Sequence, residues 1–345
     1  MVNAPDPLDD AQLADGIARW IAQRHGIDDV VVDELEHPSA GYSSITTLLR
    51  ARWASDGPTT RHLVVRMAPS PAGTFPDYDL VAQDAAQHAA ADAGVAIAAP
   101  LVTEVDPSFL GAPFSVMPRV DGHIVGEAPP FDRWLLSLGN AGQATLHDNF
   151  LATLATIHGA ATARAVAGGV PVRDNRSELE YWDRYLQWST QGAPVRGLVD
   201  GLDWCRRHEP SSRDLDLRLC WGDVRLGNVV FGDDLLPLAV LDWDMAVVGA
   251  PEHDLAWFTV LDTTMQALSG RRVDGFPDRD RTIDRYRQLT SRVLHDFEWY
   301  ETFALVRSTA IMTRISILTR ESGREPVMRV DDNPLLDLVR DRIRA

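Results

Sequence analysis

The 345-residue sequence contains no lysine, so all 33 of its basic residues are arginine. A Walker A phosphate-binding loop and a Schiff-base enzyme both need a lysine amine, and the sequence therefore excludes both. Any phosphate clamp in this chain must use arginine, whose guanidinium binds oxyanions in a bidentate manner and cannot act as a base.

Cysteine is also scarce, and the two that occur, Cys205 and Cys220, form no CxxC pair and no metal-ligand spacing. This argues against a disulfide scaffold and against a structural zinc site. The first ten residues, MVNAPDPLDD, do not have the basic start of a signal peptide. The longest nearly uncharged apolar stretch, residues 94–102, is too short to span a bilayer. We therefore expect a cytoplasmic protein with no membrane partner.

The balance of charge bears on the partners of the protein. Fifty acidic residues against 33 basic ones give a formal net charge of −17. Proteins that bind nucleic acids gain most of their affinity from basic residues on phosphates, so we expect no nucleic-acid partner. Most of these charges are expected to form a solvated surface. A chain of this length suggests two domains or lobes.

The first third of the chain alternates strand and helix signals. Residues 8–27 carry apolar side chains at helical spacing. After them the patterns predict three strands, a helix and two more strands, at residues 30–35, 44–53, 61–67, 78–93, 101–105 and 113–117.

Long helical patterns dominate beyond residue 122. Helices are predicted at residues 131–138, 143–165, 176–190, 197–207 and from 252 to the end, around short strands at 217–220, 229–231 and 238–241. The change of character predicts an α+β protein with two lobes. We expect an N-terminal lobe over residues 1–118, a hinge near 117–122, and a helical C-terminal lobe over 123–345.

The short strands frame the most informative stretch, WGDVRLGN at residues 221–228 and LDWD at 241–244. Asp223 and Asn228 occupy the two ends of a loop, and Asp242 follows a hairpin that returns the chain to the same place. We therefore expect two carboxylates and one amide oxygen to converge, a ligand set that suits Mg²⁺. A structural alternative is that these are ordinary turn-forming residues.

Phosphoryl transfer needs the same set of parts. One carboxylate orients the attacking hydroxyl, a carboxylate and an amide hold the metal on the phosphates, and a cation meets the developing charge. Asp223, the pair Asp242 and Asn228, and Arg225 can fill these roles in turn.

Residues 221–254 resemble the catalytic core of the aminoglycoside phosphotransferase and choline kinase family, part of the protein-kinase-like superfamily. The RLGN, LDWDMA and PEHDLAW segments are most similar to phosphotransferase-like domains associated with acyl-CoA dehydrogenases. The resemblance implies a bilobal protein-kinase-like fold. It also implies transfer of phosphate from ATP, with Mg²⁺, to a hydroxyl of a small molecule.

The family resemblance also assigns roles to single residues. It places Asp223 at the catalytic base, Asn228 and Asp242 at metal positions, and Arg225 near the γ-phosphate. It makes Asp254 a buried anchor for the backbone of the catalytic loop. His158 matches a helix position of the family, which we interpret as a packed helix-end histidine and not as a ligand.

In the N-terminal lobe the resemblance implies a glycine loop on the phosphates, a strand cation, its helical partner and a hinge against adenine. The matching residues are Gly41, Tyr42, Ser43, Ser44, Arg66, Gln83, Met117, Pro118 and Val120. Each position could instead have a purely structural role. The glycine could form an ordinary turn, Arg66 could be a solvated charge on a strand, and the hinge could be a connector between the lobes.

Three residues depart from the family pattern. Trp221 replaces a histidine two residues before the base, Gln83 replaces a glutamate, and Arg66 replaces the usual lysine. These departures leave open an alternative function, a nucleotide-binding regulatory module with weak or absent turnover. A protein kinase is disfavoured because little chain separates Asp244 from Glu252. The acceptor molecule and the oligomeric state are not readable from the sequence.

Overall fold

The computed structural model describes residues 8–38, 45–54, 59–69, 73–211 and 215–344. The chain divides into two compact units. The first comprises the described residues of Met1–Asp84 together with Ala98–Val120, and the second comprises Ala85–Ile97 with the described residues of Asp121–Ala345. Helix α2 (Leu80–Asp92) contributes to both units. No helix among the described residues is long and apolar enough to cross a membrane.

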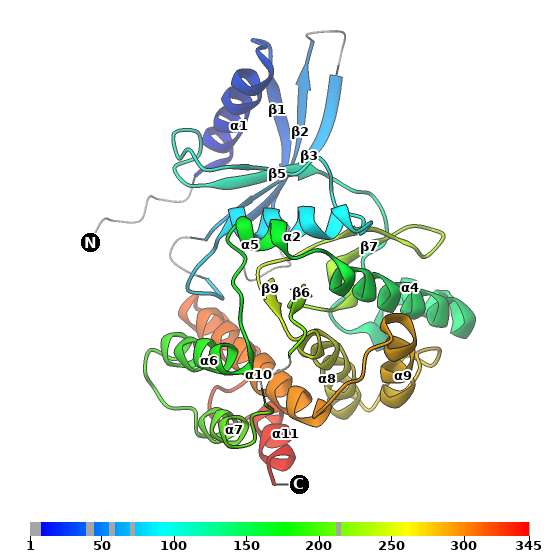
Figure 1. Cartoon of the computed structure of the whole chain (residues 1–345). Helices are drawn as coiled ribbons and strands as arrows, with labels where there is room; N and C mark the ends of the chain where they lie inside the picture. The colour runs from blue at the N-terminus through cyan, green and yellow to red at the C-terminus, as the bar shows by residue number, and fades with distance from the viewer. Residues whose placement is uncertain (1–7, 39–44, 55–58, 70–72, 212–214, 345) are drawn as a thin grey trace. The chain divides into compact units, whose positions relative to one another are not determined.

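The first unit contains a five-stranded antiparallel sheet in the order β1-β2-β3-β5-β4 (Figure 1). The strands are β1 (Val31–Glu36), β2 (Ile45–Trp53), β3 (Thr59–Met67), β4 (Val102–Glu104) and β5 (Phe114–Pro118). Helix α1 (Asp10–His25) begins with a capping box between Asp9 and Gln12. Its apolar face, which includes Ile17 and Trp20, is buried in the same core cluster as side chains of the sheet.

The second unit is mainly helical and contains two small sheets. The sheets pair β6 (Arg218–Cys220) with β9 (Val247–Gly249) and β7 (Val229–Phe231) with β8 (Pro237–Val240). The α-helices that begin beyond residue 120 are α3 (Arg133–Ser137), α4 (Gly139–Gly159), α5 (Ala163–Ala167), α6 (Asn175–Ser189), α7 (Arg196–Arg207), α8 (Glu252–Ser269), α9 (Arg279–Thr290), α10 (Phe297–Glu321) and α11 (Pro334–Arg342). Two short 3₁₀ turns are η1 (Pro129–Phe131) and η2 (Leu226–Asn228).

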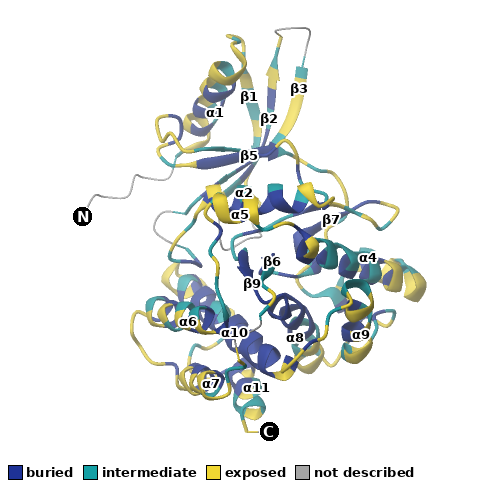
Figure 2. Cartoon of the chain, viewed as in Figure 1, coloured by how far each residue is buried: buried dark blue, intermediate teal, exposed yellow. Residues whose placement is uncertain are grey.

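The first half of α8 and most of α10 are buried inside the second unit, as their dark colour in Figure 2 shows. Nineteen of the 25 residues of α10 are buried, so little of this helix faces solvent. A helix that is covered on most sides must bury any polar residue it carries. The buried charged residues of α10, Glu301, Arg307 and Arg314, must therefore be compensated by partners inside the second unit.

Three contacts join the segment Ala85–Ile97 to other residues of the second unit. A Cβ at Gly168 would lie 2.1 Å from the Cβ of Ala85, so the two backbones approach closely. The Val240 N–H donates to the Ala96 carbonyl at 2.9 Å. Arg164 forms an ion pair with Asp92 at 2.8 Å. The predicted lobes of residues 1–118 and 123–345 stay a prediction.

The α+β fold class that the sequence predicts is confirmed. The predicted strands of the first third all occur, with the helix between the third and the fourth. Two details differ in the second unit. The predicted helix at 143–165 is two helices, because α4 ends at Gly159 and α5 begins at Ala163. Strand β9 was not predicted.

A buried histidine of α4 makes the stability of the second unit depend on pH. Desolvation lowers the pKa of His147 to about 4. As the pH falls from 6.5 towards 4, the unfolded state binds a proton that the folded state does not, so the folded state loses stability. We expect wild-type protein to lose about 3 kcal/mol more free energy of unfolding over this range than His147→Leu.

The measurement is urea denaturation between pH 7 and pH 4. His295→Gln is the control, because His295 is exposed on the same unit and its replacement is expected to leave the pH dependence unchanged. Equal pH dependence in wild type and His147→Leu would contradict the prediction.

Candidate functional site

The small strands of the second unit carry the predicted catalytic loop. Strand β6 ends at Cys220, the loop of residues 221–228 follows, and β7 and β8 then form the predicted hairpin. The Leu241 N–H donates to the Asn228 carbonyl at 2.8 Å, so the chain entering Asp242 lies beside the end of the loop. The indole of Trp221 donates to the Asp242 carbonyl at 3.1 Å. The hairpin thus returns Asp242 to the loop that holds Asp223, as the spacing predicts.

The carboxylate of Asp223 is held by three N–H donors. Its Oδ1 accepts from the indole of Trp257 at 3.0 Å. Its Oδ2 accepts from Arg225 Nε at 2.9 Å and from Asn228 Nδ2 at 2.8 Å. The side chain is 20% exposed, so it is largely shielded but remains in reach of solvent. These bonds fix the orientation of a carboxylate that can still meet a small molecule.

Arg225 lies between two carboxylates. Besides Asp223 it contacts Glu127, whose side chain is 76% exposed. Burial lowers the pKa of Arg225, but Asp223 and Glu127 together outweigh this effect and raise the pKa above its ordinary value. A permanent positive charge therefore sits two residues after Asp223, at the position where the sequence predicts a cation.

Asn228 is buried and uses its amide nitrogen within the loop. Its Nδ2 donates to the backbone carbonyl of Asp223 at 3.0 Å as well as to the carboxylate. Among the described residues no donor is bonded to its Oδ1. The amide oxygen is thus the atom of Asn228 that can coordinate a cation.

Asp242 has a backbone conformation that L-residues rarely adopt, with φ at 58°. Aspartate tolerates this left-handed region better than most residues, but it remains costly. Such outliers cluster at functional sites, where the surrounding structure enforces them. The Trp221 indole bonds the carbonyls on both sides of this conformation, those of Leu241 and Asp242, at 2.9 and 3.1 Å.

The backbone of the loop is anchored by Asp254 of α8. Its Oδ2 accepts from the Trp221 N–H at 2.6 Å, and its Oδ1 accepts from the Gly222 N–H at 3.0 Å. Asp254 is 1% exposed. Gly222 has a φ of 94°, and a Cβ there would lie 2.3 Å from the Met245 carbonyl oxygen, so only glycine fits. The structural role expected for Asp254 is confirmed.

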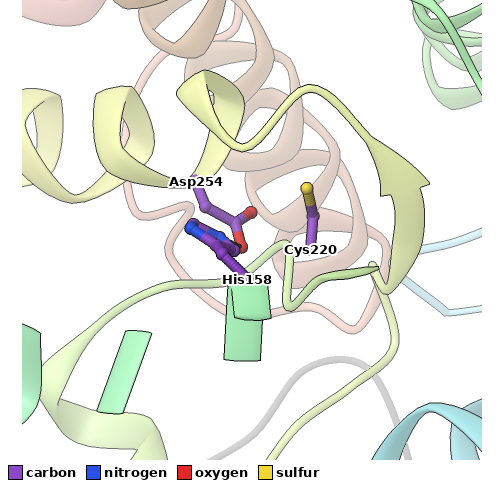
Figure 3. A group of neighbouring side chains, drawn as sticks. All are labelled: His158, Cys220 and Asp254. Atoms are coloured by element: carbon purple, nitrogen blue, oxygen red, sulfur yellow. Dashed lines mark hydrogen bonds and ion pairs between the residues drawn. The ribbon is translucent and has the colours of Figure 1, made fainter. Parts of the chain in front are cut away.

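His158 at the end of α4 supports this anchor, as Figure 3 shows. Its Nε2 lies 3.1 Å from Asp254 Oδ2, and its Nδ1 lies 2.6 Å from the Tyr286 hydroxyl. Burial raises the pKa of Tyr286, which keeps the hydroxyl protonated. Nε2 therefore donates to the Asp254 carboxylate, which can only accept, and Nδ1 is bonded to the Tyr286 hydroxyl. His158 is a packed helix-end histidine, as predicted.

The ligand atoms of His158, Cys220 and Asp254 lie within 4.8 Å of one another, which makes them a geometric candidate for a metal site. Both ring nitrogens of His158 and both oxygens of Asp254 already form hydrogen bonds. Burial raises the pKa of the Cys220 thiol well above its ordinary value, which disfavours the thiolate that binds metals. We interpret this cluster as the support of the loop and not as a metal centre.

Trp221 replaces the histidine expected before the catalytic base, and the structure shows what it does instead. Its ring is 1% exposed. Its backbone N–H binds Asp254, and its indole N–H binds the carbonyls at Leu241 and Asp242. One residue therefore ties the loop both to α8 and to the segment of Asp242.

The sequence did not predict Trp257 as a contact of Asp223. The residue lies three positions after Asp254 on α8, so both side chains share one face of the helix. The PEHDLAW segment contains both residues, and the helical spacing was the signal that could have placed Trp257 near the loop.

The residues predicted to bind nucleotide lie in the first unit or outside the described residues. Arg66 is half-buried on β3, opposite Thr46 of β2 and Ser115 of β5. Gln83 is buried in α2. Their roles stay predictions.

The remaining predicted nucleotide contacts are the hinge and the glycine loop. Met117 and Pro118 lie on β5 opposite β3, and Val120 ends the first unit. The predicted glycine loop, Gly41, Tyr42, Ser43 and Ser44, lies outside the described residues.

Loss of the anchor should destabilise the second unit. In Asp254→Asn an amide N–H₂ replaces one acceptor oxygen and faces a buried backbone N–H. We expect a loss of about 3 kcal/mol in the free energy of unfolding, measured by urea denaturation. Asp274→Asn, a substitution of an exposed aspartate on the same unit, should change stability by less than about 0.5 kcal/mol. Equal stability of Asp254→Asn and wild type would contradict the anchoring role.

Comparison with known proteins supports the family resemblance. The chain is 26% identical over 170 residues to human acyl-CoA dehydrogenase family member 11. This match covers 48% of this chain and 21% of the human protein. It is 30% identical over 168 residues to the mouse protein, covering 47% of this chain and 20% of the relative. The match thus spans about a fifth of the length of these relatives.

Solved structures show the same fold. A candidate aminoglycoside phosphotransferase from Ralstonia eutropha JMP134 has a TM-score of 0.68 at 19% identity, covering 95% of this chain and 97% of that one. Macrolide 2'-phosphotransferase MphH from Brachybacterium faecium has a TM-score of 0.54 at 15% identity, covering 95% and 98%. The chain thus has the bilobal kinase-like fold that the resemblance implies.

The family model of the phosphotransferase enzyme family matches residues 47–292, which include most of β2, all of β3 to β9 and the whole predicted catalytic loop. The match covers well over half of the chain and contains Asp223, Asn228, Asp242 and Asp254. The chain therefore belongs to the phosphotransferase enzyme family.

Proposed function

We propose that this chain transfers the γ-phosphate of ATP, with Mg²⁺, to a hydroxyl of a small molecule. The observation that carries the proposal is the Asp223 carboxylate, held by three N–H donors next to Asn228 and the segment of Asp242. Phosphoryl transfer depends mainly on positioning and on electrostatic stabilisation, and this site offers both. Membership of the phosphotransferase family supports the same reaction class.

Asp223 would orient the acceptor hydroxyl and accept its proton. A solvent-accessible carboxylate with a fixed orientation is suited to this task. Arg225 would stabilise negative charge on the phosphate during transfer. Glu127 pairs with Arg225 from an exposed position, so an incoming phosphate would compete with it for the guanidinium.

The donor set at the end of the loop fits Mg²⁺. Asn228 Oδ1 and the carboxylate of Asp242 are hard oxygen ligands, and Mg²⁺ prefers a few such ligands together with water and phosphate oxygens. Bound there, the ion would neutralise charge on the nucleotide phosphates. Within the loop, the Asn228 Nδ2 bonds to Asp223 keep the amide oxygen facing away from the base.

For the nucleotide we propose the residues of the first unit: Arg66 on the phosphates, Gln83 beside it, Met117, Pro118 and Val120 against the base, and the segment of Gly41, Tyr42, Ser43 and Ser44 over the phosphates. One structure of the same fold, aminoglycoside 2'-phosphotransferase-IIIa, is a GDP complex with a TM-score of 0.52. This supports nucleotide binding and makes GTP a donor to test beside ATP.

The acceptor is proposed as a small molecule with a free hydroxyl. Structures of the same fold include a macrolide phosphotransferase and a kanamycin complex, so the fold accommodates unlike acceptors. The charge of −17 would favour a cationic acceptor, whereas the similarity to acyl-CoA dehydrogenase family member 11 favours a hydroxyacyl compound. Fold does not select between them.

The test is a screen for ADP or GDP release over a panel of hydroxyl compounds with Mg²⁺. With an active acceptor, we expect Asp223→Asn to lower kcat by about 100-fold or more, because the variant cannot accept the proton. KM for ATP should change little. The control, Asp233→Asn, changes an aspartate that is 99% exposed in the hairpin turn, and it should retain wild-type kcat.

Two outcomes would contradict the proposal. Asp223→Asn with wild-type kcat would remove Asp223 from the mechanism. Nucleotide binding in a thermal-shift assay without turnover of any acceptor would favour the alternative function, a regulatory module.

A further inference from the structure

An arginine lies in the interior of the second unit, on α10. Arg307 is 3% exposed, and its Nε has no hydrogen-bond partner. Its Nη2 donates to the His253 carbonyl at 3.3 Å, and its Nη1 lies 3.6 Å from Glu178 Oε1 of α6. Burying an ion pair with an unsatisfied N–H often costs more than an apolar side chain of similar volume. Stability alone therefore gives a weak reason for an arginine here.

The charge of Glu178 is divided among several partners. Its Oε2 accepts from Arg173 at 3.2 Å, and its Oε1 accepts from the Trp182 indole at 2.8 Å. Glu178 is thus nearer to these two donors than to Arg307. The positive charge of Arg307 is only partly neutralised by its carboxylate partner.

Aromatic rings surround the guanidinium instead. The Cζ of Arg307 lies 5.1 Å from the ring centroid of Phe303, 5.2 Å from Trp257 and 5.7 Å from Trp182. A cation within about 6 Å of an aromatic face is attracted by the negative charge of the ring face. The attraction is stronger when the pair is shielded from water, as it is here.

One of these rings, that of Trp257, is hydrogen-bonded to the catalytic loop. The indole N–H of Trp257 is the donor that binds Asp223 Oδ1 at 3.0 Å. Trp257 therefore has a buried cation near its ring and a carboxylate at its N–H. A cation near the ring withdraws electron density, which makes the N–H a stronger donor. Polarisation of this kind strengthens linked hydrogen bonds in a low-dielectric interior.

We propose that Arg307 is a positioning residue for Asp223 and that it acts through the indole of Trp257. The inference rests on the proposed function, in which Asp223 must face the acceptor hydroxyl. Arg307 does not touch Asp223 or any reacting atom. It strengthens the Trp257 hydrogen bond, which holds one carboxylate oxygen while Arg225 and Asn228 hold the other.

The same helix supplies a matched comparison. Arg314 lies seven residues after Arg307 on α10, is 7% exposed, and has its Cζ 4.5 Å from the ring centroid of Trp188. Trp188 forms no hydrogen bond with Asp223 among the described residues. Arg314→Met thus removes a buried cation near a tryptophan that is not the indole donor to Asp223.

The first measurement needs no turnover. We would record the indole N–H resonances of ¹⁵N-labelled protein and identify that of Trp257 by its loss in Trp257→Phe. In Arg307→Met this resonance should move upfield, because the hydrogen bond weakens. In Arg314→Met it should stay in place. Arg307→Gln, which can still donate to the His253 carbonyl, should behave like Arg307→Met and carries the test if that variant does not fold.

The second measurement is steady-state kinetics with an acceptor found in the screen. Trp257→Phe and Arg307→Gln should each lower kcat by about tenfold with KM for ATP unchanged, because misplacing a reacting group is costly. Arg314→Met should keep wild-type kcat. A purely structural role would lower the melting temperature and leave both the Trp257 resonance and kcat unchanged.

The results separate the two proposals. An unmoved Trp257 resonance in the Arg307 variants, or their turnover at wild-type kcat, overturns the role of Arg307. A resonance that moves as expected in a protein that turns over no acceptor supports the link from Arg307 to Asp223 and overturns the proposed function.

Discussion

The arrangement of the predicted catalytic loop depends on one buried carboxylate, that of Asp254. Two consecutive backbone N–H groups, those of Trp221 and Gly222, donate to its two oxygens. A buried carboxylate without these donors would be strongly destabilising, so the loop and α8 constrain each other. His158 and Tyr286 extend the same network into α4 and α9. Asp223 directly follows Trp221 and Gly222, so its backbone is held in place by the same two hydrogen bonds.

Trp221 shows how a departure from a family pattern can be compensated. A histidine in this position would brace the loop through its ring, and the indole does so by bonding the carbonyls that precede and include Asp242. The second of these carbonyls belongs to Asp242, whose backbone is left-handed. The proposed base and the proposed metal aspartate are therefore connected through one buried side chain, which explains why Trp221 is compatible with an ordered site.

The sequence predicts correctly those parts of the site whose arrangement depends on local spacing along the chain. A loop followed by a hairpin returns Asp242 to Asn228 whatever the rest of the fold does, and alternating patterns placed the strands around Arg66. The sequence was insufficient where helices pack. Trp257 reaches Asp223 across 34 residues, and Arg307 reaches Trp257 from another helix. Such contacts depend on how α8 and α10 are turned towards each other, which periodicity alone does not determine.

The central claim is that Asn228 and Asp242 hold a divalent ion next to Asp223. The most direct measurement is a crystal structure with Mn²⁺ and a non-hydrolysable ATP analogue, with anomalous scattering to locate the metal. The account predicts an anomalous peak bonded to Asn228 Oδ1 and to the carboxylate of Asp242. A peak at the His158, Cys220 and Asp254 cluster, or an Asp242 carboxylate directed away from Asn228 in the loaded protein, would contradict it.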